Sequence, residues 1–248
     1  MIQDPFFYLV AIPAVLIVGI SKGGLGGGLG LIAVPLLALA VPPTTAAAIM
    51  LPILCLMDLV GLWKFRGKGD ARCLKTLLPA ALVGIVLGAL SFRYLTDDHI
   101  RLIVGTIAIS FTLNYYLRKS SQQPRQQNLA RGSFWGALSG FTSFSVHAGG
   151  APLNIYLLPL RLEKQAYIGT TIVFFAAVNY IKLIPYGMLG QFNTDLLTTS
   201  AVLAVLAPVG VLTGAWLQHR INEGVFYHLC YGFLMLAGIK LFYDVFSH

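Results

Sequence analysis

Charged residues are scarce in this chain. Asp, Glu, Lys and Arg make up only 10% of its 248 residues, whereas 57% are hydrophobic, and the mean hydropathy is +0.77. A soluble domain carries about 25% charged residues, so this chain has too few to cover a water-exposed surface. Several apolar runs approach the roughly 20 residues that a helix needs to cross a bilayer. They span residues 45–63, 77–92, 99–117, 166–185, 196–217 and 225–246.

Residues and motifs for catalysis, metal binding or redox chemistry are equally sparse. The three cysteines (Cys55, Cys73 and Cys230) have neither metal-ligand nor redox spacing, and the five histidines are dispersed. No G-x-x-x-x-G-K-[ST] motif is present to bind a nucleotide. We therefore expect no enzyme activity, no cofactor and no metal site. The net charge of +8 is typical of basic cytoplasmic loops in a membrane protein and does not indicate nucleic-acid binding.

The chain repeats itself. A shift of 121 residues places Gly19 on Gly140 and Asp58 on Asn179, and a shift of 126 aligns "VGIVLGA" (83–89) with "VGVLTGA" (209–215). The ordered series of matches predicts a first membrane repeat over residues 1–117 and a second over 132–248. The polar segment 118–131 is predicted to be a cytoplasmic linker between them.

Loop charge predicts that the two repeats have opposite orientations. Loop 64–75 carries five basic residues, whereas its counterpart 185–195 carries none. The next pair reverses this pattern, because 41–45 is uncharged and 161–165 carries two basic residues. Since basic loops stay in the cytoplasm, corresponding loops are expected on opposite faces, as in an inverted repeat. Both termini are then expected outside the cytoplasm. We expect the protein to lie in the cell membrane, which would be a bacterial inner membrane.

The fold class predicted is therefore all-α: a polytopic integral membrane protein with two inverted-topology repeats. Each repeat is expected to begin with a pair of short or re-entrant helices, formed by 5–20 with 25–40 and by 132–146 with 149–160. Three transmembrane helices follow each pair. The 12 residues of 149–160 reach only about 18 Å at 1.5 Å per residue, short of a hydrocarbon core of about 30 Å.

Two glycine-rich stretches lie at the turning points of these pairs, "SKGGLGGGLG" (21–30) and "GFTSFSVHAGGAP" (140–152). Such glycines can simply allow close helix packing. However, helices broken at matching positions of inverted halves point to a transport site. Backbone N–H groups, hydroxyls and the Lys22 ammonium there suit an anion. The candidate substrate-binding residues are Ser21, Lys22, Gly23, Gly24, Gly27, Gly28, Thr142, Ser143, Ser145, His147, Gly149, Gly150, Asn154, Asn179 and Lys182.

Three intramembrane titratable residues have open roles. Asp58 is a candidate for ion coupling because a buried carboxylate is costly, but pairing with Lys22 and exposure to water near its helix end are alternatives. His147 fits a proton-sensitive role or a hydrogen-bonded structural one. Lys182 either contributes to the site or extends to the membrane interface.

The stretches "GISKGGLGGGLGLIAVPLL" (19–37), "LVGIVLGAL" (82–90) and "GGAPLNIYLLPLRLEKQAYIGTTIVFFAAVNYIKL" (149–183) together resemble the sulfite exporter TauE/SafE family. The resemblance covers almost the whole chain. It implies a secondary transporter of small anions, especially sulfite, organosulfonates or related sulfur compounds. The family's first glycine motif falls on Gly23, Gly24, Gly27 and Gly28, and its second on Gly149, Gly150 and Pro152, with Ala151 where a third glycine is common.

The expected partners are a small anionic substrate and the lipid bilayer. Direction of transport, coupling ion and oligomeric state stay open at this point. A transition-metal permease and a non-transporting membrane assembly factor are the alternative functions.

Overall fold

A computed structural model describes residues 1–24, 27, 29–92, 94, 96–117, 126–217, 220 and 223–246 of the chain. These residues form helices and no strands. In chain order the elements are α1 (Pro5–Gly24), η1 (Gly30–Ile32), α2 (Ala33–Leu37), α3 (Pro43–Lys64), α4 (Ala71–Phe92), α5 (Asp97–Leu117), α6 (Leu129–Val146), α7 (Gly150–Leu157), η2 (Leu158–Leu160), α8 (Lys164–Met188), α9 (Thr194–Ala204), α10 (Leu206–Leu217) and α11 (Glu223–Phe246).

Five helical segments among the described residues are long and apolar enough to cross a membrane. They are α1, α3, Ala71–Ser91 of α4, α8, and the segment Thr194–Leu217 that α9 and α10 form together. The chain is thus an all-helical, multi-pass membrane protein, as its composition predicted. Of these segments α3 and α8 are the most buried, which places them at the centre of the bundle.

The two opening helix pairs differ from the prediction in one respect. The first helix of each pair is long: α1 has 20 residues and α6 has 18, so α1 spans about 30 Å at 1.5 Å per residue. Only the second members are short, since α2 has 5 residues and α7 has 8. The expected helix 5–20 continues to Gly24 because each further turn satisfies backbone groups that lipid cannot. This need outweighs the low helix propensity of glycine.

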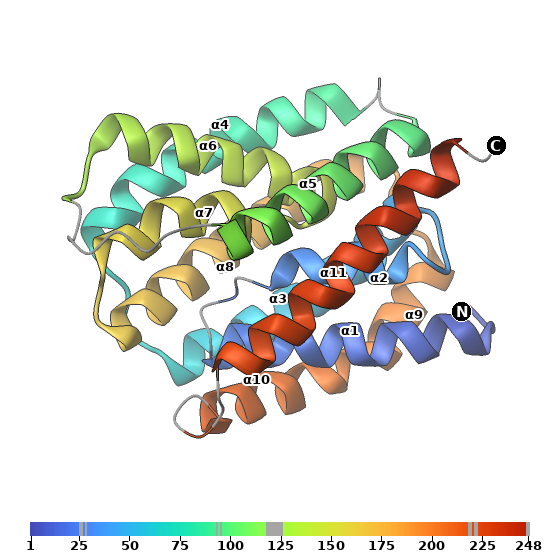
Figure 1. The fold of residues 1–248 in the computed structure, drawn as a ribbon, viewed down its shortest axis with the longest axis horizontal. Helices are drawn as coiled ribbons and strands as arrows, with labels where there is room; N and C mark the ends of the chain where they lie inside the picture. Colours follow the sequence, from blue (N-terminus) through green and yellow to red (C-terminus); the bar gives the residue numbers. More distant parts are fainter. Residues whose placement is uncertain are drawn as a thin grey trace.

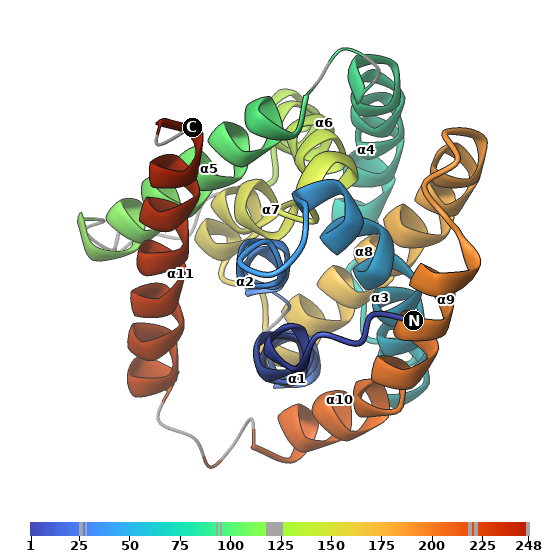
Figure 2. The same cartoon turned by 90° about the vertical axis from the view of Figure 1, so that its right-hand side faces the viewer.

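The two hairpins enter the molecule from opposite ends (Figure 1). The N-terminus and the connection 38–42 lie at one end, so α1 and α2 form a hairpin that returns to its starting side. The α6–α7 hairpin begins and finishes at the other end, where the connections 65–70 and 158–163 also lie. The connection 189–193 and the C-terminus share the end of the N-terminus. Seen from that end, α1 and α2 occupy the middle of the molecule, between α11 and the α9–α10 segment (Figure 2).

Helix contacts are reciprocal between the halves. The two most extensive pairings are α4 on α6 and α1 on α10, and exchanging the halves converts one into the other. Both pairings bring backbones together at glycine. A Cβ at Gly140 would overlap the Ala81 carbonyl of α4, and a Cβ at Gly214 would overlap the Ile20 carbonyl of α1. Small residues therefore give these helix pairs their close approach, as is usual in membranes.

Asp70 fixes the start of α4 at the end of the molecule that carries the basic loop. Its carboxylate accepts a hydrogen bond from the Cys73 N–H at 2.7 Å, and its own N–H donates to Thr170 Oγ1 at 2.8 Å. Burial raises the pKa of Asp70, but hydrogen bonds from Cys73, Gln127 and the Arg72 backbone lower it more, so the pKa lies below its usual value. The carboxylate is thus a charged N-cap of α4, and the backbone N–H of Asp70 joins this helix start to α8.

Removing this cap should weaken the fold in a pH-dependent way. We expect Asp70→Ala to cost about 1 kcal/mol, or about 2–4 °C in the unfolding midpoint for a chain of this size. Because the folded-state pKa is lowered, this stabilisation is complete above the unfolded pKa of about 3.9 and is lost as pH falls through the folded value. Thermal unfolding in detergent should therefore separate the two proteins more at pH 7 than at a pH below about 3.9. An equal difference at both pH values would exclude the charged cap.

Candidate functional site

Both hairpin tips reverse the chain with the same backbone hydrogen bond. The N–H of Gly27 donates to the Ser21 carbonyl at 2.9 Å, and the N–H of Ala148 donates to the Thr142 carbonyl at 3.1 Å. These two bonds join residues that correspond under the shift of 121. Each tip also contains a left-handed residue, Gly27 with φ 68° and His147 with φ 55°. One carbonyl near the end of α1 and one near the end of α6 are thereby satisfied inside the protein.

The tips meet near the middle of the molecule, where α7 packs against η1. A buried lysine lies at each tip. Lys22 belongs to the last turns of α1, whereas Lys182 extends from α8 to the end of α6. The two lysines have different partners: Lys22 is paired with a carboxylate, whereas Lys182 is bonded to neutral groups.

Lys22 is paired with the buried carboxylate of α3. Its ammonium forms an ion pair with Asp58 Oδ1 and lies 3.5 Å from the Leu54 carbonyl oxygen and 5.9 Å from the centre of the Phe175 ring. The second oxygen of Asp58 accepts a hydrogen bond from Asn179 Nδ2 at 2.6 Å. Asp58 is 1% exposed, so it does not face water at the helix end. The repeat-related residues Asp58 and Asn179 thus bond directly to each other.

Lys182 is bonded to neutral acceptors at the second tip. Its Nζ lies 2.8 Å from the Ser143 carbonyl oxygen, 3.0 Å from Ser143 Oγ and 2.8 Å from His147 Nδ1. Three acceptors match the three N–H donors of an ammonium. The side chain is fully buried, so it points into the protein and not toward the membrane interface. His147 Nε2 lies 2.9 Å from the Ala47 carbonyl; since Nδ1 accepts from Lys182, Nε2 carries the proton and the ring is neutral.

The buried charges at the tips do not balance. Two lysines and one carboxylate give a net charge of +1 among residues that are less than 10% exposed. An uncompensated charge in a low-dielectric interior is costly. The arrangement therefore favours a bound anion over a bound cation.

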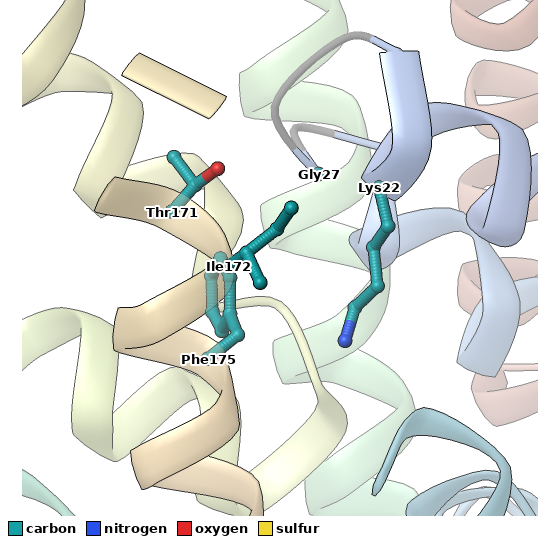
Figure 3. Close-up of a pocket in the computed structure, with 5 residues that line it drawn as sticks. All are labelled: Lys22, Gly27, Thr171, Ile172 and Phe175. Carbon is teal, nitrogen blue, oxygen red and sulfur yellow. The ribbon is translucent and has the colours of Figure 1, made fainter. Parts of the chain in front are cut away.

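A narrow pocket adjoins Lys22 (Figure 3). Lys22 and Gly27 line it from the first tip, and Thr171, Ile172 and Phe175 line it from α8. The space between its atoms is about 150 Å³, which includes part of its opening. The Lys22 side chain borders the pocket, Ile172 and Phe175 give it an apolar wall, and it is too narrow for a ligand in this conformation.

The predicted glycines divide into two groups. Gly23 and Gly24 pack against α10, where an added Cβ would overlap the backbone of Val211 and Gly214 respectively. Gly27 lines the pocket. Gly149 lies against Ser139, whose Oγ donates to the Gly149 carbonyl at 2.7 Å. Gly150 begins α7, and Gly28 lies outside the described residues.

Most predicted polar side chains are already bonded within the protein. Thr142 and Ser145 donate to carbonyls one turn earlier in α6, at 2.8 and 3.1 Å. Ser21 Oγ accepts from the Leu29 N–H at 3.1 Å, which stabilises the first tip. Asn154 accepts from the Tyr167 hydroxyl at 2.7 Å, and neither belongs to the hydrogen-bond networks of Lys22 and Lys182.

One face of α8 carries residues of the candidate site that the glycine pattern did not reveal. Thr171 and Phe175 line the pocket, and the Tyr186 hydroxyl donates to the Phe144 carbonyl at 2.8 Å. Their spacing in the sequence is the pattern that could have identified this face of α8. Thr171, Phe175, Asn179, Lys182 and Tyr186 follow one another at intervals of four, four, three and four residues, which places them on one side of a helix.

A metal site finds no support in the described part of the chain. There, no three His, Cys, Asp or Glu side chains lie close enough together to hold a metal ion.

Comparison with known proteins agrees with the sequence resemblance. The model of the family described as "Sulfite exporter TauE/SafE" matches residues 11–241. No curated protein and no solved structure gives a significant match.

A glycine that packs against α10 should respond to substitution differently from a tip glycine with open space around it. Gly24→Val should lower the unfolding midpoint and the yield of folded protein, because its side chain would overlap the Gly214 carbonyl. Gly30→Ala is the matched control, since the nearest atom to its Cβ, the His147 carbonyl oxygen, is 3.9 Å away. Thermal unfolding of the purified variants measures both effects. A Gly24→Val protein as stable as the parent would contradict the packing role.

Proposed function

The chain belongs to the sulfite exporter TauE/SafE family, and on that basis we propose that it moves a small sulfur-containing anion across the cell membrane. The membership establishes a multi-pass membrane transporter. The proposed substrates are sulfite, an organosulfonate or a related sulfur compound. The proposed site lies between the two hairpin tips, beside Lys22.

The excess positive charge at the tips carries this proposal. The Lys182 ammonium is hydrogen-bonded to neutral acceptors, and the Lys22 ammonium is paired with Asp58, the buried carboxylate of the cluster. An oxyanion that enters the pocket next to Lys22 would bring one negative charge to a cluster that carries +1. A metal cation would add to it, so the charges do not favour the metal-permease alternative.

The pocket walls are consistent with a sulfonate or sulfite group. The Lys22 ammonium supplies a charge, Gly27 brings backbone close to the ligand, and the Thr171 side chain lies on the opposite wall. Ile172 and Phe175 form an apolar side that suits the carbon-bearing part of an organosulfonate. Because the pocket is closed here, substrate entry requires the tips and α8 to separate.

We propose the inverted topology for the membrane orientation, with repeats at 1–117 and 132–248, a cytoplasmic linker at 118–131 and both termini outside. Reciprocal helix contacts and hairpins that enter from opposite ends support this arrangement. In such folds, one repeat moves against the other to expose a central site to each side in turn. The tips are where that movement would open the pocket.

Asp58 is the proposed coupling residue. It is buried, it pairs with the lysine that borders the pocket, and it contacts Asn179 of the other half. A group so placed can respond to substrate on one side and to the second repeat on the other.

The role of Lys22 can be tested in a variant that removes both members of the buried ion pair. In an Asp58→Asn background, Lys22→Met should weaken isethionate and sulfite binding by about 10- to 150-fold, from the 1.5–3 kcal/mol of a hydrogen bond to a charged group. Binding to purified protein and flux into proteoliposomes are the measurements. Lys75→Met in the same background is the control for loss of a lysine, because Lys75 is exposed near the start of α4. Equal affinity in both double variants would place the anion site elsewhere.

The orientation can be tested with two exposed positions, Lys68 and Thr194. A cysteine at each position, in a cysteine-free background, should react with a membrane-impermeant maleimide from opposite sides of the membrane. We expect Lys68→Cys to be labelled from the cytoplasm and Thr194→Cys from outside. Labelling of both from one side would exclude the inverted topology.

A further inference from the structure

We propose that binding of one anion is linked to uptake of one proton by Asp58, so that the two cross the membrane together without net charge. This inference rests on the proposed function, because it concerns the same site. It adds the coupling ion, the stoichiometry and the residue that accommodates the proton.

The geometry makes Asp58 and the anion competitors for one ammonium. Lys22 borders the pocket, and its Nζ is engaged by Asp58 Oδ1 and the Leu54 carbonyl oxygen. An anion that draws the Lys22 ammonium into the pocket must weaken or break that ion pair. Asp58 is 1% exposed and cannot turn to water. A carboxylate left without its cation in such a place is strongly destabilised, and protonation removes the charge.

Asn179 provides a partner for the protonated state. Its Nδ2 donates to Asp58 Oδ2 at 2.6 Å, whereas its Oδ1 is buried and has no hydrogen-bond partner among the described residues. Rotation of the amide by 180° would present Oδ1 to Asp58. The new carboxyl O–H could then donate to Oδ1, and the same pair of side chains would satisfy both protonation states.

The other groups around Asp58 fit this assignment. Titratable neighbours are Lys22 of α1, Cys55 of α3, and Tyr180 and Lys182 of α8. Farther along α3, the neutral His147 bonds to the Ala47 carbonyl. Asp58 is the carboxyl in this group, and the lysines and His147 already have hydrogen-bond partners.

The charges balance in the proposed step. Before binding, Lys22, Lys182 and Asp58 sum to +1. The anion contributes −1 and forms an ion pair with Lys22, while one proton from solution adds to a carboxylate oxygen of Asp58 and makes it neutral. The sum is again +1, so the occupied site carries the same charge as the empty one. The change of conformation that carries the substrate across therefore moves no additional charge.

The experiment uses purified protein with isethionate, which stays a monoanion throughout the pH range. If one proton binds with each anion, isethionate affinity should fall about tenfold per pH unit above the coupling range. In Asp58→Asn the affinity should not change with pH. Asp70→Asn, an acid-to-amide change outside the cluster, should keep the parental slope. Asn179→Leu should keep the slope but shift the pH at which affinity begins to fall, because it removes the partner of both protonation states.

Proteoliposomes that contain a pH-sensitive dye measure the stoichiometry directly. We expect one proton per isethionate and a flux that does not respond to a clamped membrane potential. Isethionate flux without proton movement, or an Asp58→Asn variant that keeps the parental slope, would overturn this inference and leave the proposed anion transport intact. Absence of isethionate and sulfite flux in the parent would instead contradict the proposed function itself.

Discussion

A charge buried in the membrane interior must find a partner within the protein, and the Lys22–Asp58 ion pair is where this requirement organises the fold. The pair joins the end of α1 to the last two turns of α3, and Asn179 extends the connection to α8. Breaking such a pair from one side leaves a buried charge and costs about 3–5 kcal/mol. The first hairpin tip is therefore held against the central helices by one interaction.

The second tip is held by a different solution to the same constraint. Lys182 reaches it from α8 and gives its three donors to Ser143 and His147. Repeat-related positions hold Asp58 in one half and Asn179 in the other. Two aspartates there would make the lysine cluster neutral. The amide leaves it with a net charge of +1, which is the physical basis of the proposed anion site.

Backbone hydrogen bonding explains why some glycines of the first tip pack against a helix and another reverses the chain. Lipid offers no partners for N–H and C=O groups, so α1 continues helically through Gly23 and Gly24, which then serve as the contact with α10. The reversal is left to Gly27, whose φ of 68° suits a residue without a Cβ. Close packing and chain reversal thus occur within one glycine-rich segment, a few residues apart.

Much of this protein could be predicted from the sequence because its main determinants are local and additive. Apolar length and scarcity of charge predicted the helical membrane protein, and the glycine-rich segments located both hairpin tips. The family resemblance was confirmed over residues 11–241. Helix spacing in 171–186 would also have revealed the functional face of α8, since it depends only on the helical period.

Other features depended on contacts between residues far apart in the chain. Gly23, Gly24 and Gly27 look alike in sequence, and only α10 and α8 distinguish packing from pocket lining. Asp58 had three open roles until its partners, 36 and 121 residues away, were known. The sequence by itself determined that the chain is a helical membrane protein and which stretches are apolar enough to cross a membrane, because transfer to lipid acts on each segment separately. Only the tertiary structure decided which buried charges are paired, because pairing is a property of distance and not of residue type.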